Sequence, residues 1–190
     1  MASVIGICNS ALIKLGATTI MSLDEQSRNA NLCKEQYEKL RDELLRSHTW
    51  NFATARAKLA RLAAPPVFGV SYAFQLPADF LRALSVAGSD TAAIGVEYRI
   101  EGRKLLSDSA AIWIRYVRAA SDPNEMDASF REALAWRLAI DLALPITQSS
   151  MVLSEMREGL TRAVLSARSI DALEDTTEQL PESGWVSIRG

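Results

Sequence analysis

The sequence contains few of the residues from which metal centres and catalytic sites are built. Its 190 residues include one histidine, His48, and two cysteines, Cys8 and Cys33. A structural zinc site takes four nitrogen or sulfur ligands, so the sequence predicts no metal site. It also has no glycine-rich phosphate loop and no nucleophile elbow. These absences predict a protein that is not an enzyme and that has no cofactor.

Long apolar runs and a basic leader are absent as well. No run approaches the roughly 20 apolar residues that span a bilayer, so we expect no membrane partner. The opening residues, 1–4, lack the basic start of a secretory signal. The formal net charge of -2 is not typical of a nucleic-acid-binding protein. Cys8 and Cys33 are expected as buried thiols in a reducing compartment, although a disulfide between their helices stays an alternative.

Apolar residues that recur every three or four positions predict helices at both ends of the chain. Ser3 is expected to cap the first helix and Gly16 to end it. The first two helices can pack stripe to stripe. The third is apolar nearly all round, which predicts a central position in a bundle; Ser129 and Glu132 have the spacing of a capping box. The predicted helices cover residues 3–15, 28–47, 127–145 and 149–173.

The middle of the chain alternates apolar and polar residues, which is typical of half-buried strands. Connections too short for crossover helices favour antiparallel pairing. We therefore predict an α+β fold: an antiparallel bundle of about four helices, a small antiparallel β-meander inserted between the second and third helices, and an extended C-terminal tail. The bundle comprises residues 1–50 and 127–173, the meander residues 51–126 and the tail residues 174–190. Strands are expected at 53–59, 71–76, 81–86, 97–100, 104–106 and 112–117.

Three apolar residues in the C-terminal tail have no helix to belong to. Trp185, Val186 and Ile188 follow an acidic stretch, and disordered tails seldom contain such residues. They are candidates for docking on another subunit. The alternative is that they fold back onto the core of their own chain.

Basic residues gather around the passage from the second helix into the first strand. Contact with phosphate is one interpretation of this cluster, and a solvated surface is the other. The aromatic residues that interleave with basic residues in single-strand binding proteins are absent here. The cluster consists of Arg41, Arg46, Arg56, Lys58 and Arg61.

The titratable residues that resemble catalytic groups have simpler interpretations. His48 lies at the predicted end of the second helix, where it can stabilise the helix dipole, and the sequence offers it no partner beyond Thr49. Asp122, Glu125 and Asp127 could mimic a glycosidase pair. Acidic residues just before a helix are typically caps.

Three segments are more particular than their periodicity requires. They are Ile7-Cys8-Asn9-Ser10-Ala11-Leu12-Ile13-Lys14-Leu15-Gly16, Leu45-Arg46-Ser47-His48-Thr49-Trp50-Asn51-Phe52-Ala53-Thr54 and Tyr72-Ala73-Phe74-Gln75-Leu76-Pro77-Ala78-Asp79-Phe80-Leu81-Arg82. In this order they resemble the tail tubular protein A family of podophage head-to-tail adaptors. The resemblance extends over nearly the whole chain, and its motifs are structural rather than catalytic.

The resemblance implies a virion protein of the tail or neck, assembled in the host cytoplasm. Members of that family form a dodecameric ring beneath the portal protein, and the ring contacts the next tail or nozzle component. DNA passes through the central channel during packaging and ejection. The C-terminal segment of family members reaches onto the portal.

Two other functions fit the sequence less well. A double-stranded DNA-binding regulator should have a recognition helix with Arg, Lys, Asn or Gln clustered on its exposed face, whereas the second helix mixes both signs. A virion-associated cell-wall hydrolase would have to use the carboxylates at 122–127.

Overall fold

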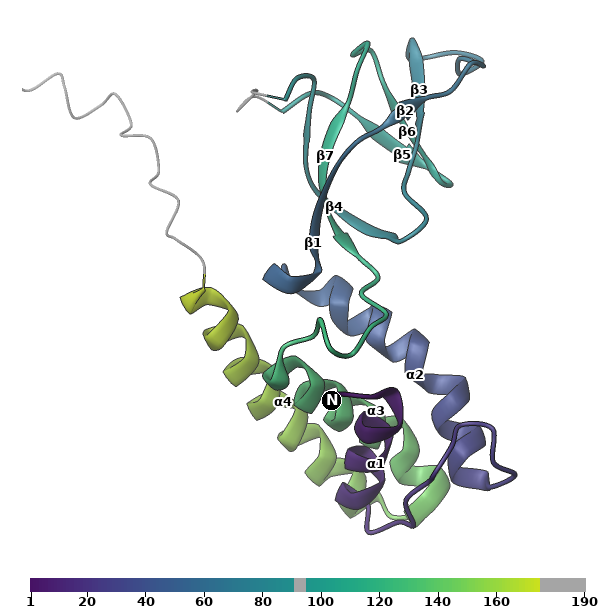
Figure 1. Cartoon of the computed structure of the whole chain (residues 1–190), viewed down its shortest axis with the longest axis vertical. Helices are drawn as coiled ribbons and strands as arrows, with labels where there is room; N and C mark the ends of the chain where they lie inside the picture. The colour runs from purple at the N-terminus through teal and green to yellow at the C-terminus, as the bar shows by residue number, and fades with distance from the viewer. Residues whose placement is uncertain (91–94, 175–190) are drawn as a thin grey trace, which may run out of the picture.

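Helices form one end of the molecule and strands the other (Figure 1). The computed structural model describes residues 1–90 and 95–174, and over these ranges the predicted α+β class is confirmed. The helices are α1 (Val4–Lys14), α2 (Arg28–Ser47), α3 (Ala128–Thr147) and α4 (Ser150–Leu173), with a 3₁₀ turn, η1, at Asn51–Ala53. The strands are β1 (Thr54–Lys58), β2 (Ala60–Arg61), β3 (Tyr72–Gln75), β4 (Phe80–Ala87), β5 (Arg99–Glu101), β6 (Lys104–Ser107) and β7 (Trp113–Arg118).

The helix α3 is the centre of the bundle, as its apolar composition predicts. It packs against α1, α2 and α4, and its residues Phe130, Leu134 and Leu138 are fully buried. The stripes of α1 and α2 meet each other over a small area, at Cys8 and Cys33, and each helix packs mainly against α3. The apolar surface all round α3 lets it satisfy the stripes of both helices at once.

The helix ends follow the sequence signals in part. Ser3 Oγ accepts a hydrogen bond from the backbone N–H of Gly6 at 3.0 Å, and Gly16 has a φ of 65°. The predicted capping box is wrong: Asp127 occupies the N-cap position of α3 and makes no side-chain capping bond. The Glu132 carboxylate instead pairs with Lys14 Nζ on α1 at 2.8 Å.

Pro145 does not end α3, contrary to expectation, because the helix continues to Thr147. A proline inside a helix removes one i→i−4 hydrogen bond, here the one to the carbonyl of Asp141, and the residues that follow Pro145 still complete the last turn. The helix ends instead at Gln148, which has a φ of 53° and donates its backbone N–H to the carbonyl of Leu144 at 3.1 Å. This left-handed residue closes the helix as a glycine commonly does.

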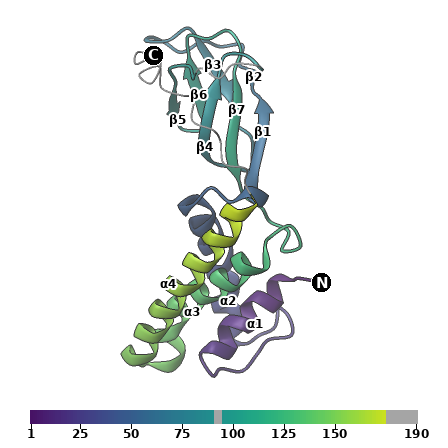
Figure 2. The same ribbon diagram turned by 90° about the vertical axis from the view of Figure 1, so that its left-hand side faces the viewer.

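The strands form two antiparallel sheets rather than a single meander. Their orders are β1-β7-β4 and β2-β3-β6-β5, so the first strand pairs with the last one, and Figure 2 shows them side by side. β5 and β6 pair as an antiparallel hairpin whose turn contains Gly102, at a φ of 58°. The meander prediction failed because sequence periodicity identifies strands but not their partners.

Each end of the molecule has its own core. One core joins the four helices and includes Trp50 and Val117; the other lies between the two sheets and includes Phe74, Leu105 and Ile114. We call residues 54–118 the β module. At its base, Trp50 is fully buried and its Nε1–H donates to the carbonyl of Leu44 at 3.1 Å.

Aromatic packing by Trp50 and Phe52 attaches the β module to the bundle. Each of these rings meets Phe130 of α3 edge to face, with 5.0 Å between ring centroids. Edge-to-face pairs of this kind contribute about 0.5–1.5 kcal/mol beyond the burial of their area. The start of the first strand is thereby fixed to the central helix.

The contact between α3 and α4 generates a prediction at Gly159. A Cβ atom at this position would lie 2.4 Å from the ring of Trp136, and Lys14 Nζ lies 4.7 Å from the centre of that ring. Gly159→Ala should therefore lower the free energy of unfolding by ~1–3 kcal/mol, although alanine favours helices. Urea unfolding measures the change.

The matched control for Gly159→Ala is Ser166→Ala, at an exposed position of the same helix. This substitution should alter the free energy of unfolding by no more than ~0.5 kcal/mol. Equal or greater stability of Gly159→Ala would contradict the close packing of α4 on Trp136.

Candidate interaction surfaces

A polar contact ties the last turns of α4 to the start of the β module. Asp171 is buried, and its Oδ1 accepts a hydrogen bond from the backbone N–H of Asn51 at 2.8 Å. The Asn51 side chain donates from Nδ2 to the carbonyl of Asp171, also at 2.8 Å. We call these two hydrogen bonds, both donated by Asn51, the hinge latch. It fixes the point from which the chain leaves α4.

His48 lies beside the hinge latch, at the C-cap of α2 as predicted. Its Nε2 is 3.4 Å from Asp171 Oδ2, and its ring meets Trp50 edge to face at 4.8 Å. The sequence did not reveal this carboxylate, because 123 positions separate the two residues along the chain. Burial lowers the pKa of His48, and the positive charges of Arg168 and Arg82 act in the same direction, whereas Asp171 raises it.

The five basic residues of the predicted cluster do not share one surface. Arg41 is only 7% exposed and its Nε pairs with Asp42 at 2.8 Å, so its assignment as a surface residue is wrong. Arg46 donates to the carbonyl of Leu81. Arg61 lies over the ring of Tyr72, 5.0 Å from its centroid.

Arg56 and Lys58 remain together on the exposed side of β1. The structure adds Arg115, which the sequence cluster missed: its Cα is the register partner of Arg56 across β1 and β7. Residues directly opposite each other point to the same face of a sheet. The alternation of β7, with exposed Arg115 between buried Ile114 and Tyr116, was the signal that could have identified it.

The outer side of α4 exposes apolar side chains near its C-terminal end. Leu165 is 60% and Leu173 is 85% exposed, and Ile170 lies between them in the chain. In Figure 2, no other helix covers this side of α4. The helix buries its other side against α3, so this face is left without a partner in the single chain.

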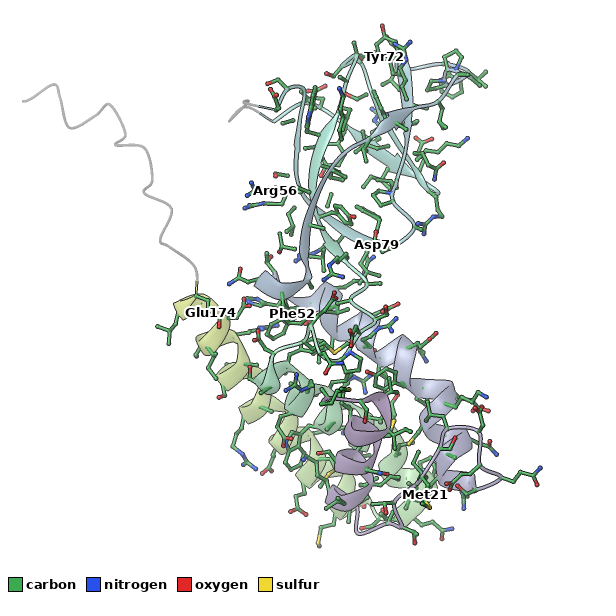
Figure 3. The ribbon with its side chains drawn as sticks, viewed as in Figure 1. Met21, Phe52, Arg56, Tyr72, Asp79 and Glu174 are labelled. Carbon is green, nitrogen blue, oxygen red and sulfur yellow. The ribbon has the colours of Figure 1, made fainter. Side chains whose placement is uncertain are left out.

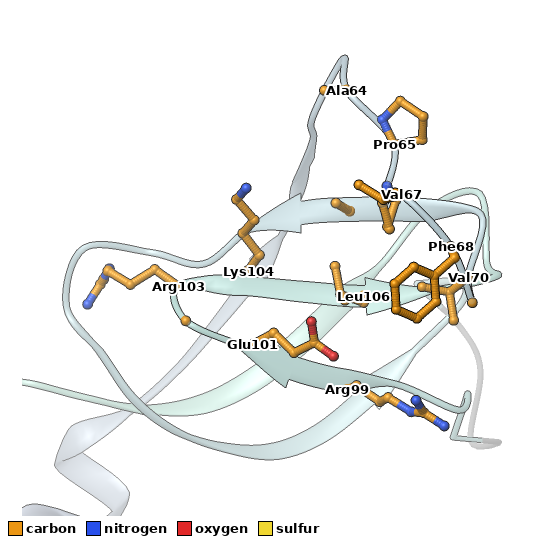
Figure 4. A pocket seen from close by; sticks show the side chains of 14 residues that line it. Ala64, Pro65, Val67, Phe68, Val70, Arg99, Glu101, Arg103, Lys104 and Leu106 are labelled. Atoms are coloured by element: carbon orange, nitrogen blue, oxygen red, sulfur yellow. The ribbon is translucent and has the colours of Figure 1, made fainter.

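Both far ends of the molecule also expose apolar residues. At the tip of the β module Val67 is 98% and Phe68 is 88% exposed. They belong to the loop 64–70, which lines a pocket of about 560 Å³ together with Arg99 and residues 101–104 (Figure 4). At the opposite end Met21, labelled in Figure 3, is largely exposed, and so is Met151 at the start of α4.

The acidic residues before α3 have structural contacts. Asp122 Oδ1 accepts from the backbone N–H of Asn124 at 2.9 Å, and Glu125 pairs with Arg118 at 2.8 Å. These bonds hold the connection between β7 and α3.

Cys8 and Cys33 are free thiols and fully buried, as expected. A hydrogen bond to Cys33, together with burial, raises the pKa of Cys8. The Cys8 thiol is therefore far from the thiolate form that reacts.

Within residues 1–90 and 95–174, no three His, Cys, Asp or Glu side chains gather as a metal site requires. None of the helices in these ranges is long and apolar enough to cross a membrane. The candidate docking residues Trp185, Val186 and Ile188 lie outside the described residues.

No protein-family model matches the chain, and no curated protein matches its sequence. The arguments about function therefore start from the surfaces described above.

The hinge latch predicts a cost for losing the Asp171 carboxylate. Asp171→Ala leaves the backbone N–H of Asn51 without its acceptor, so the free energy of unfolding should fall by ~1–3 kcal/mol. Hydrogen exchange should also become faster in the last two turns of α4. Glu174→Ala, at the exposed C-cap of α4, is the control and should leave both measurements unchanged. Unchanged exchange in Asp171→Ala would contradict the latch.

His48 predicts a pH dependence of stability. Because the folded-state pKa is lower than the unfolded value of about 6.5, the unfolded chain binds more protons as the pH falls through that value. The contribution of His48 to stability should therefore decrease between pH 7.5 and pH 5.5. It is measured as the free energy of unfolding of the wild type minus that of His48→Gln. A difference that grows on acidification would show that the pKa is raised instead.

Proposed function

We propose that the protein is a viral structural protein, a ring-forming head-to-tail adaptor that joins a portal to the next tail component and surrounds the DNA channel. The observation that carries the proposal is the exposed apolar face of α4, formed by Leu165, Ile170 and Leu173. Exposed apolar residues that lie close together favour an interface with another protein. The resemblance of the three sequence motifs to the tail tubular protein A family is the reason for proposing this kind of assembly.

A ring requires two different lateral surfaces on each subunit, because one patch must meet another patch of the next copy. The apolar face of α4 supplies one candidate surface. Its position on the side of the bundle, rather than at an end, suits a lateral contact (Figure 2). Burying a leucine side chain contributes about 1.5–3 kcal/mol, so two leucines supply much of the energy that a subunit contact needs.

The two ends of the long axis suit the axial contacts of an adaptor. The loop with Val67 and Phe68 extends from the β module, and Met21 and Met151 lie at the far end of the bundle. An adaptor between two rings needs a contact surface at each end. In this proposal the bundle end meets the portal and the β-module tip meets the next tail component.

The ring proposal predicts a change of mass when the purified chain is mixed with the portal protein of the same virus or prophage. Native mass spectrometry should detect a complex with many copies of the chain on one portal. Leu165→Glu combined with Leu173→Glu should weaken this complex at least roughly tenfold, because each 1.4 kcal/mol of lost burial corresponds to a factor of ten.

The double variant Ser154→Glu, Thr161→Glu adds the same two charges at exposed positions of α4 that lie on the N-terminal side of the apolar face. It is the matched control and should leave the complex intact. A wild-type chain that stays monomeric at every ratio to portal would count against the adaptor function. An assembly that tolerates both leucine substitutions would count against α4 as the lateral surface.

A further inference from the structure

The exposed face of the sheet β1-β7-β4 carries a concentration of positive charge. Arg56 and Arg115 are register partners on adjacent strands, and both are exposed. Like charges directly opposite each other destabilise a sheet. Neither guanidinium has an ion pair with the described residues, and Lys58, two positions along β1, adds a third positive charge.

Positive charge is separated from negative charge along the chain. The β module, residues 54–118, has nine basic and five acidic residues, whereas the whole chain has 21 and 23. The β module is therefore +4 and the rest of the chain is -6. Negatively charged residues that attract the β module are therefore present in the same chain.

The charged residues line a groove that also has an apolar, aromatic part. The groove has a volume of about 810 Å³, and Arg56, Lys58 and Arg115 lie along it with Trp113 and Tyr98. Lys58 Nζ is 4.8 Å from the centre of the Trp113 ring. A ligand that matches this lining carries carboxylates together with a large apolar side chain. Among the described residues that line the groove, Asp90 alone is acidic.

The segment that follows α4 has this composition. Residues 175–190 contain the carboxylates of Asp175, Glu178 and Glu182, and then Trp185 and Ile188. All its charges before position 189 are negative. In this segment the single tryptophan comes after the acidic residues. In the groove the aromatic residues lie beside the basic ones.

The start of this segment lies close to the groove. The hinge latch joins Asp171 to Asn51, and Arg56 is only five residues beyond Asn51, at most ~18 Å of extended chain. α4 ends at its C-cap, Glu174, and Glu178 is four residues beyond it, which spans up to ~14 Å when extended. Figure 3 labels Arg56 and Glu174 on the same side of the molecule, and Figure 2 views the end of α4 just below that sheet.

We propose that the basic groove on the β1-β7-β4 sheet is a docking site for residues 175–190 of the same chain, with their carboxylates on Arg56, Arg115 and Lys58 and Trp185 beside Trp113 and Tyr98. The short tether gives the segment a high effective concentration at the groove. Charge-assisted bonds to two guanidinium groups offset the repulsion between them. This inference does not depend on the ring, because it concerns a contact within one chain.

Zero-length carbodiimide crosslinking of the full-length chain tests the proposal. The reagent joins an amine to a carboxylate only where the two are in contact, and mass spectrometry identifies the linked residues. Lys58 should link to Asp175, Glu178 or Glu182 at low salt, and the yield should fall in 1 M sodium chloride because salt screens the contact. Lys104, exposed on β6 of the other sheet, should form no such link.

Arg56→Ser combined with Arg115→Ser keeps Lys58 and removes the rest of the charge. The link should then decrease roughly tenfold, while Arg99→Ser, an exposed arginine on β5, leaves it unchanged. Thermal unfolding checks that the variants are folded.

Three outcomes overturn the proposal. The first is the absence of a Lys58 link in the wild type at low salt. The second is a link that joins light to heavy chains in an isotopically mixed sample, which would make a second copy the occupant. The third is a wild-type chain that forms no Lys58 link but binds duplex DNA, with the substitutions at Arg56 and Arg115 abolishing that binding. Phosphate would then be the ligand of the groove. A link within one chain supports the proposal whether or not the protein assembles on a portal.

Discussion

The burial of Trp50 is the constraint on which the rest of the structure depends. The chain leaves α2 and enters the β module at this residue, and its ring has no exposed surface. Phe130 holds the ring from α3, and the carbonyl of Leu44 accepts its N–H from the last turns of α2. A buried indole with a satisfied N–H favours one orientation over others. The direction of β1, and through pairing that of the whole sheet, follows from it.

The hinge latch adds α4 to the same junction. Asn51 comes directly after Trp50 and bonds to Asp171 through both its backbone and its side chain. The central helix α3, the end of α4 and the first strand therefore meet within a few residues. The apolar face of α4 and the basic groove of the sheet are both positioned relative to this junction, so a change there would move both surfaces together.

Local signals in the sequence predicted most elements, because caps, glycine positions and periodicity act over a few residues. Ser3 and Gly16, at the two ends of α1, are examples. The same local signals did not predict the contacts between segments that are distant in the sequence. The pairing of β1 with β7, the neighbourhood of His48 and the opposition of Arg56 to Arg115 each join residues about 60 or more positions apart. Arg41 was wrongly predicted to lie on the surface for a related reason. The periodicity of a helix indicates the direction in which a side chain points from the helix axis, but not how far a neighbouring element extends over that side chain.

The pairing of the first strand with the last has a consequence for how such a chain can change. Thr54 and Val117 are register partners, and paired residues in an antiparallel ladder have Cα atoms only about 4.5–5.5 Å apart. The chain therefore passes from the bundle into the β module and back again at two neighbouring points. Strands and loops beyond these points can be lengthened, exchanged or given different charges while α2 and α3 keep their positions. The helical bundle and the surface of the β module can thus diversify separately.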